Sequence, residues 1–148
     1  MQQLKNVLEL MKIGEKLKME MRHSWLSNGR RESVAEHTWS TSLLAMAIAP
    51  YLPQKVNVEK LLKMVIIHDL VEAYARDIPA FYTMDDEEAR ALKLENETKA
   101  IEKIRDLLGG ENGQQFYDLW FEFENKESYE GKVATALDKL EAQIQQNW

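Results

Sequence analysis

The chain has 148 residues, of which 45% are hydrophobic and 30% charged, and it contains three prolines and no cysteine. This length fits a single domain, and the many Leu, Lys, Glu, Ala and Met residues favour an all-α fold. Without cysteine there is neither a disulfide framework nor a thiolate metal site, and the net charge of −6 argues against a broad nucleic-acid-binding surface.

The N-terminal third begins with a helix and a loop. Apolar residues at helical spacing predict a first helix over most of residues 3–20. We expect residues 21–33 to form a loop, because Asn28-Gly29 is a turn signal and three arginines make this the most cationic segment. The chain shows no signal peptide and no apolar stretch long enough to span a membrane, so we expect a cytoplasmic protein without a membrane partner.

Two helices are predicted next from their capping residues. Ser33, with Glu36 three residues later, matches a capping box and predicts a helix up to about Ala49, where prolines follow. Asn57 is expected to cap the next helix, which contains no glycine or proline before Pro79. We therefore expect this third helix to end near Pro79.

The C-terminal half predicts three more helices. Asp85 begins a long charged helix that Gly109-Gly110 ends, and a short aromatic helix follows. Gly131 precedes a last helix. Its expected inward stripe is Val133, Leu137, Leu140 and Ile144. Residues 1–148 are thus predicted to form one bundle of about six helices.

A His-Asp pair interrupts the apolar run of the third predicted helix. His68 and Asp69 lie in this run, and Glu72 follows one helical turn later. In a continuous helix these three side chains would lie along one edge. His37 and Asp138 are similar polar positions on apolar faces of two other helices. Burying such groups is costly unless something compensates them. Two imidazoles and two carboxylates suit one divalent metal ion, such as Mn, Co, Mg, Fe, Ni or Zn.

Two further carboxylates fit catalytic roles in a hydrolysis at phosphorus. Glu72 is placed to take a proton from an attacking water molecule or to orient that molecule. Asp77, at the predicted end of the third helix, could protonate a leaving alkoxide or shape the pocket. Both interpretations depend on a metal site beside them.

Three segments in this order and spacing resemble the HD-domain metal-dependent phosphohydrolases, and more narrowly their 5′-deoxynucleotidase branch. The segments are Glu-Ser-Val-Ala-Glu-His at 32–37, His-Asp-x-x-Glu at 68–72 followed by Asp-Ile-Pro at 77–79, and Ala-Leu-Asp-Lys-Leu-Glu at 136–141. The resemblance extends over nearly the whole chain, from Arg22 to Glu141. It implies an HD-domain helical bundle.

The resemblance also implies a set of functional residues. The implied metal ligands are His37, His68, Asp69 and Asp138. It implies that Glu72 and Asp77 serve catalysis, and that Arg22 and a tryptophan, matched by Trp25 with a small shift, contact the nucleotide. The implied reaction is hydrolysis of a deoxyribonucleoside 5′-monophosphate to the nucleoside and phosphate, and the implied assembly is a homodimer.

Two departures from the family pattern bear on substrate identity. Arg76 stands where the family usually has a small residue, and it either adds a phosphate contact or points to solvent. The chain ends at Trp148, so we expect it to lack the family's C-terminal segment. Alternatives are hydrolysis of another nucleotide (a triphosphate, a cyclic nucleotide or a guanosine polyphosphate) and a non-catalytic, metal-stabilised helical module.

Overall fold

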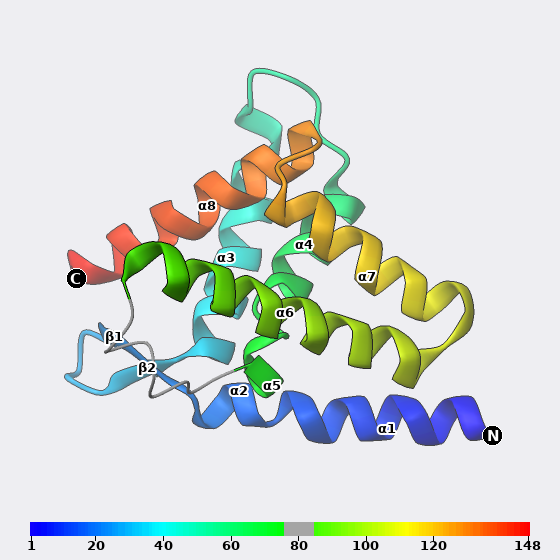
Figure 1. The fold of residues 1–148 in the computed structure, drawn as a ribbon. Coiled ribbons are helices and arrows are strands. Elements are labelled where there is room, and N and C mark those ends of the chain that lie inside the picture. The colour runs from blue at the N-terminus through cyan, green and yellow to red at the C-terminus, as the bar shows by residue number, and fades with distance from the viewer. Residues whose placement is uncertain (76–84) are drawn as a thin grey trace.

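A computed structural model of the chain describes residues 1–75 and 85–148 (Figure 1). The prediction of an all-α fold with about six helices is confirmed, since six helices of eleven residues or more form the described bundle. These are α1 (Gln2–Gly14), α3 (Val34–Ile48), α4 (Val58–His68), α6 (Asp86–Leu108), α7 (Gly110–Glu124) and α8 (Tyr129–Gln146). The shorter elements are α2 (Lys16–Met19), β1 (Met21–Trp25), β2 (Arg31–Ser33), the 3-10 helix η1 (Ala49–Tyr51) and α5 (Glu72–Ala75). Among these elements, no helix combines the length and apolar character that crossing a bilayer requires.

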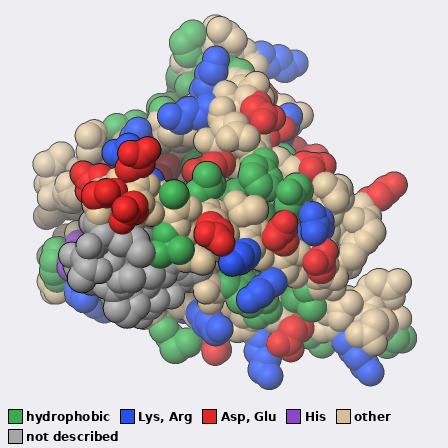
Figure 2. Space-filling model, in the orientation of Figure 1, with side chains coloured by type: hydrophobic (Ala, Val, Ile, Leu, Met, Phe, Trp, Pro, Cys, Tyr) green, Lys and Arg blue, Asp and Glu red, His purple; other side chains and the backbone are tan. Residues whose placement is uncertain are grey.

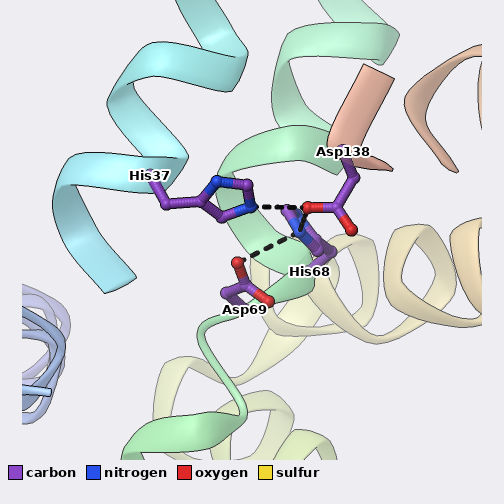
Figure 3. Close-up of side chains that lie close together, drawn as sticks. All are labelled: His37, His68, Asp69 and Asp138. Atoms are coloured by element: carbon purple, nitrogen blue, oxygen red, sulfur yellow. Dashed lines mark hydrogen bonds and ion pairs between the residues drawn. The ribbon is translucent and has the colours of Figure 1, made fainter. Parts of the chain in front are cut away.

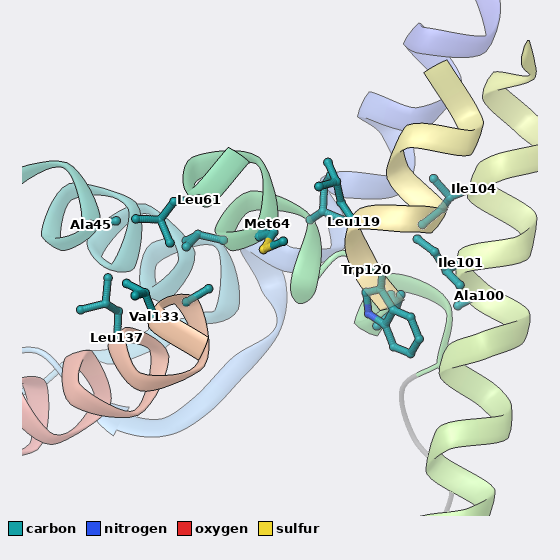
Figure 4. Packing of buried hydrophobic residues seen from close by; sticks show 14 of the residues in the cluster. Ala45, Leu61, Met64, Ala100, Ile101, Ile104, Leu119, Trp120, Val133 and Leu137 are labelled. Carbon is teal, nitrogen blue, oxygen red and sulfur yellow. The ribbon is translucent and has the colours of Figure 1, made fainter. Parts of the chain in front are cut away.

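Helix α4 lies at the centre of the bundle, where α3, α7 and α8 pack against it (Figure 1). Its buried residues Leu61, Met64, Val65 and His68 recur every three or four positions and so form one helical face. Trp120 of α7 belongs to the same hydrophobic core (Figure 4). Burying one large apolar side chain contributes about 1.5–3 kcal/mol. Because His68 continues this face, packing of the core carries its imidazole into the interior.

Three predicted helix starts are confirmed by their capping hydrogen bonds. The Ser33 hydroxyl accepts from the Glu36 N–H at 3.1 Å, and the Glu36 carboxylate accepts from the Ser33 N–H at 2.7 Å, which completes the capping box. The side chains of Asn57 and Asp85 each accept a hydrogen bond from the third residue of the helix that follows. These local bonds fix where α3, α4 and α6 begin.

The last helix begins earlier than predicted. Ser128 caps α8, and Gly131 lies inside the first turn instead of preceding the helix. A Cβ atom at Gly131 would meet the backbone oxygen of Glu122 at 2.9 Å, so glycine allows α8 to approach the end of α7.

The prediction of an irregular loop over residues 21–33 is wrong, because β1 and β2 form a small antiparallel pair there. The turn between them is as predicted: the Asn28 side chain accepts from the Arg30 N–H at 3.0 Å, and Gly29 has a φ of +88°. The two strands were not predicted because they are only five and three residues long, and their many polar side chains give no alternation of apolar and polar residues. The predicted first helix is also divided, since α1 and α2 are separated at Glu15.

The prediction that the third helix continues to Pro79 is wrong as well, because α4 ends at His68. His68 Nδ1 lies 2.6 Å from the Val65 carbonyl oxygen, which the N–H of Asp69 would bind if the helix continued. Beyond this point the Glu72 N–H donates to the carbonyl of Asp69, three residues back, in a tighter turn. Glu72 therefore begins the separate helix α5 and does not extend an edge of α4.

Charges of both signs cover the face seen in Figure 2. The first turn of α6 contains Asp86, Glu87 and Glu88, where negative charge interacts favourably with the helix dipole. On this face, the described lysine and arginine side chains are scattered among acidic ones.

Candidate metal centre and active-site cavity

The four predicted metal ligands meet beside the C-terminal end of α4 (Figure 3). His37 lies in the first turn of α3, His68 is the last residue of α4, Asp69 follows it, and Asp138 belongs to α8. One donor atom from each lies within 4.8 Å of the others. The structure thus brings all four side chains together, while their role as ligands stays a prediction.

Asp138 is the hydrogen-bond acceptor that both imidazoles share. Its Oδ1 atom lies 2.7 Å from His37 Nε2 and 3.2 Å from His68 Nε2, and Asp69 Oδ2 lies 3.1 Å from His68 Nε2. Burial disfavours a charged ring in both histidines and is the largest single influence on each. The hydrogen bonds to Asp138, together with Glu141 at His37 and Asp69 at His68, outweigh burial and raise the pKa of His37 to about 9 and of His68 to about 10. Burial alone would raise the pKa of Asp138. The hydrogen bonds and positive charges of His37 and His68 instead hold this pKa well below its usual range.

The orientation of the two rings fits metal binding. His68 Nδ1 donates to the Val65 carbonyl, and His37 Nδ1 contacts the Glu141 carboxylate, so both Nε2 atoms face the shared centre. Hydrogen bonds of this kind fix the ring and tautomer of metal-bound histidines. Asp69 Oδ2 is buried, and among the described residues its polar neighbour is His68 Nε2 at 3.1 Å, which leaves this oxygen able to bind a cation. The donor set therefore fits a divalent metal ion.

Glu141 is a residue of the candidate site that the sequence interpretation missed. Its carboxylate is only 5% exposed and contacts the buried His37 ring, and Glu32 completes a second acidic group around that ring. The predicted inward stripe of α8 contained Leu140, which is 38% exposed. The buried face of α8 instead includes Ala134, Leu137, Glu141 and Gln145. The spacing of Glu141, four residues after Leu137, was the available signal.

A cavity of about 430 Å³ opens beside the metal-ligand cluster, and its volume suits a small organic ligand. Glu72 lines it next to His68, Asp69 and Asp138. Burial, together with the negative charge of Asp69, raises the pKa of Glu72 to about 7. Such a carboxylate can accept and release a proton near neutral pH. The opposite wall comes from α6, which the sequence interpretation did not connect with the site.

None of the other predicted site residues that the structure describes lines this cavity. Arg22 does not line it, and its Nε atom lies 3.3 Å from the buried carboxylate of Glu32. Trp25 is half exposed and lines a separate hollow that includes Trp148. Asp77 lies outside the described residues, as does Arg76.

Known proteins share this fold and sequence pattern. Residues 14–148 match the family model of the HD domain. A 5′-deoxynucleotidase HDDC2 from Danio rerio is 34% identical over 95% of this chain and 68% of its own length, and one from Dictyostelium discoideum is 30% identical over 96% and 76%. A crystal structure from Magnetospirillum magnetotacticum, described as a predicted metal-dependent phosphohydrolase, has a TM-score of 0.79 at 31% identity and covers 95% of this chain and 70% of that one. The resemblance found in the sequence is confirmed, and the chain belongs to the HD domain family.

Proposed function

We propose that the chain is a metal-dependent phosphomonoesterase that hydrolyses deoxyribonucleoside 5′-monophosphates to deoxynucleosides and phosphate. The observation that carries this proposal is the cluster of four donor atoms within 4.8 Å, beside a cavity that Glu72 also lines. Relatives named 5′-deoxynucleotidase, matched along nearly the whole chain, support the substrate class.

One divalent ion would be held by His37, His68, Asp69 and Asp138. Such an ion supplies Lewis-acid polarisation of a phosphoryl oxygen and lowers the pKa of water. Imidazole and carboxylate donors suit Mn, Co, Mg, Fe, Ni and Zn, so metal readdition has to identify the ion.

The chain's own groups handle the protons and the charge. Glu72 accepts a proton from the attacking water as the new O–P bond forms, and its pKa of about 7 suits that role. Asp77 is the predicted donor to the 5′-oxygen as the P–O bond breaks. Arg22 is the predicted contact for the substrate phosphate. Trp25 is the predicted contact for the nucleoside.

The test is phosphate release from ribo- and deoxyribonucleoside monophosphates, after chelation and readdition of single metals. We expect at least one metal to restore turnover and deoxynucleotides to be preferred. Triphosphates, cyclic nucleotides and guanosine polyphosphates form the comparison panel. If no metal restores release from any monophosphate, the proposal fails. A large loss of melting temperature on chelation, without turnover on any nucleotide, would instead identify a metal-stabilised helical module.

A homodimer is the expected assembly. Trp39, Leu43 and Met46 lie at helical spacing on α3 and are 65%, 53% and 59% exposed. A contiguous apolar stripe of this kind marks an interaction surface. Light scattering should give twice the chain mass for the wild type. The Leu43→Lys variant should be a monomer and give the mass of one chain. A monomeric wild type at micromolar concentration would contradict this expectation.

The cytoplasmic location and the absence of a nucleic-acid partner stay predictions. The first rests on a sequence without a recognisable signal peptide or membrane-length apolar stretch. The second rests on the net charge of −6 and on the mixed charges of the face in Figure 2. Fractionation of cells expressing the chain and a binding assay with single- and double-stranded DNA would test them.

A further inference from the structure

Helix α6 presents one face to the active-site cavity. Four residues of α6 line the cavity: Arg90, Lys93, Leu94 and Glu97. Their spacing of three or four residues places them on one side of the helix. Within residues 1–75 and 85–148, Arg90 and Lys93 form no ion pair and no hydrogen bond. By contrast Lys99, further along α6, pairs with Glu95 at 3.1 Å.

The arginines of the N-terminal hairpin already have partners. Arg30 binds the Glu36 carboxylate through two nitrogens, and Arg31 donates to the backbone carbonyl of Arg22 at 2.9 and 3.1 Å. The Arg22 side chain itself pairs with Glu32. Most of the positive charge of the hairpin is therefore used within the hairpin and at the start of α3.

The cavity has an excess of negative charge. Five of its lining side chains are carboxylates, namely those of Asp69, Glu72, Glu97, Glu124 and Asp138. A phosphate dianion entering this space is repelled unless cations face it. A divalent ion held by His37, His68, Asp69 and Asp138 would compensate the negative charge on that side. On the other side, among the described lining residues, the cationic side chains apart from His68 are Arg90 and Lys93.

Lys93 lines the cavity and acts electrostatically on two of its carboxyl groups, those of Glu72 and Glu97. Burial raises the pKa of both Glu72 and Glu97, and the positive charge of Lys93 acts against burial at both carboxyls. An ammonium group within electrostatic reach of both, and without an ion pair of its own, is positioned to meet an incoming anion.

We infer that Lys93, together with Arg90, binds the substrate phosphate from the α6 wall, opposite the metal ligands. The inference rests on the proposed function for the identity of the anion. A lysine at such a site acts as a point charge, and Arg90, one turn earlier on α6, adds a planar donor group. The phosphate then lies between the metal ligands on one side and two cations on the other.

The test compares Lys93→Met and Arg90→Met with Lys99→Met, which makes the same change on a solvent-exposed pair of α6. Loss of a charge-assisted hydrogen bond predicts a rise of about tenfold or more in KM and in the inhibition constant of inorganic phosphate for Lys93→Met. We expect a smaller rise for Arg90→Met, no change for Lys99→Met, and recovery by Lys93→Arg. Metal content and melting temperature establish that each variant folds.

Two results would overturn the inference. If Lys93→Met shifts only the pH profile and leaves KM and phosphate inhibition within twofold, Lys93 merely neutralises Glu72 and Glu97. If the wild type turns over no monophosphate, the proposed function fails, but calorimetry with inorganic phosphate on manganese-loaded protein still tests Lys93. Binding that Lys93→Met weakens at least tenfold supports the phosphate site, and binding equal in the two proteins, or absent from the wild type, refutes it.

Discussion

The two walls of the active-site cavity differ in how their charges are satisfied. On the first wall, His68 and Asp138 line the cavity. The imidazole of His68 and that of His37, which shares the Asp138 acceptor, each contact protein acceptors through both ring nitrogens. On the α6 wall, Arg90 and Lys93 have no hydrogen-bonding partner among the described residues. A satisfied cluster keeps its geometry before any ligand arrives, whereas unpaired charges stay available to one. We therefore expect the first wall to hold a metal ion and the second to receive an anion.

The largest effect on the first wall is expected from removing the acceptor that both imidazoles share. Asp138→Ala deletes the oxygen that lies between both imidazoles, so we expect loss of bound metal and of all metal-dependent turnover. Metal analysis and phosphate release measure both. Asp106→Ala, which changes a carboxylate that is 70% exposed on α6, is the control and should behave as the wild type. Full metal content in Asp138→Ala would contradict the assignment.

Glu72→Gln should separate proton transfer from metal binding. Removing a general base lowers the rate by about 10²–10⁴-fold, while the metal stays bound. Burial raises the pKa of Glu72 to about 7, and only the ionised form accepts a proton, so wild-type turnover should fall as the pH drops below about 7. Rate profiles from pH 5 to 9 test this. A variant with the wild-type acid limb would exclude Glu72 as the base, and Glu95→Gln is the matched exposed control.

Glu141→Gln should weaken the first wall without dismantling it. The carboxylate that contacts His37 Nδ1 orients the ring, and loss of such a partner typically lowers metal affinity about 10–100-fold. Excess metal should therefore restore most of the turnover. A competition titration with a chelator measures the metal affinity, and an activity assay at high metal concentration measures the restored turnover. Unchanged metal affinity would show that the fold alone orients His37.

Gly113→Ala should disturb only the second wall, and by the smallest amount. A Cβ atom there would meet the backbone oxygen of Arg105 at 2.2 Å, so α6 and α7 would have to separate. Overpacking of this kind costs about 1–3 kcal/mol of unfolding free energy. We expect a higher KM with unchanged metal affinity. Gly14→Ala, where a Cβ atom meets nothing within 4 Å, is the control in urea titrations. A metal affinity that fell with stability would show that the two walls are not independent.

The features predicted correctly from the sequence depend on local chemistry. Ser33, Asn57 and Asp85 start their helices through hydrogen bonds that span only three residues, so the pattern alone reveals them. The four residues predicted as metal ligands stood out because polar side chains interrupt apolar helical faces in a family-specific order, and their role as ligands stays a prediction. Their convergence beside α4 follows once those faces pack together.

The features that were missed depend on contacts between distant segments. Nothing in the residue types shows that the ring of His68 binds the Val65 carbonyl and ends α4. Glu141 is indistinguishable from a solvated glutamate until α8 packs against α3 and covers it. Lys93 likewise belongs to a helix so rich in charge that its cavity-facing side does not stand out.

The bond from His68 to a backbone carbonyl has a consequence for engineering the metal preference of this scaffold. If His68 binds the metal through Nε2 while Nδ1 donates to the Val65 carbonyl, only a side chain with a hydrogen-bond donor on one side and a ligand atom on the other can do both. A thiolate or carboxylate at this position would lose the helix stop even if it bound the ion. At position 37 the second partner is the side chain of Glu141, so both members of that pair can be redesigned together. Redesign for another metal should therefore begin at the pair 37 and 141 and leave the imidazole at 68 unchanged.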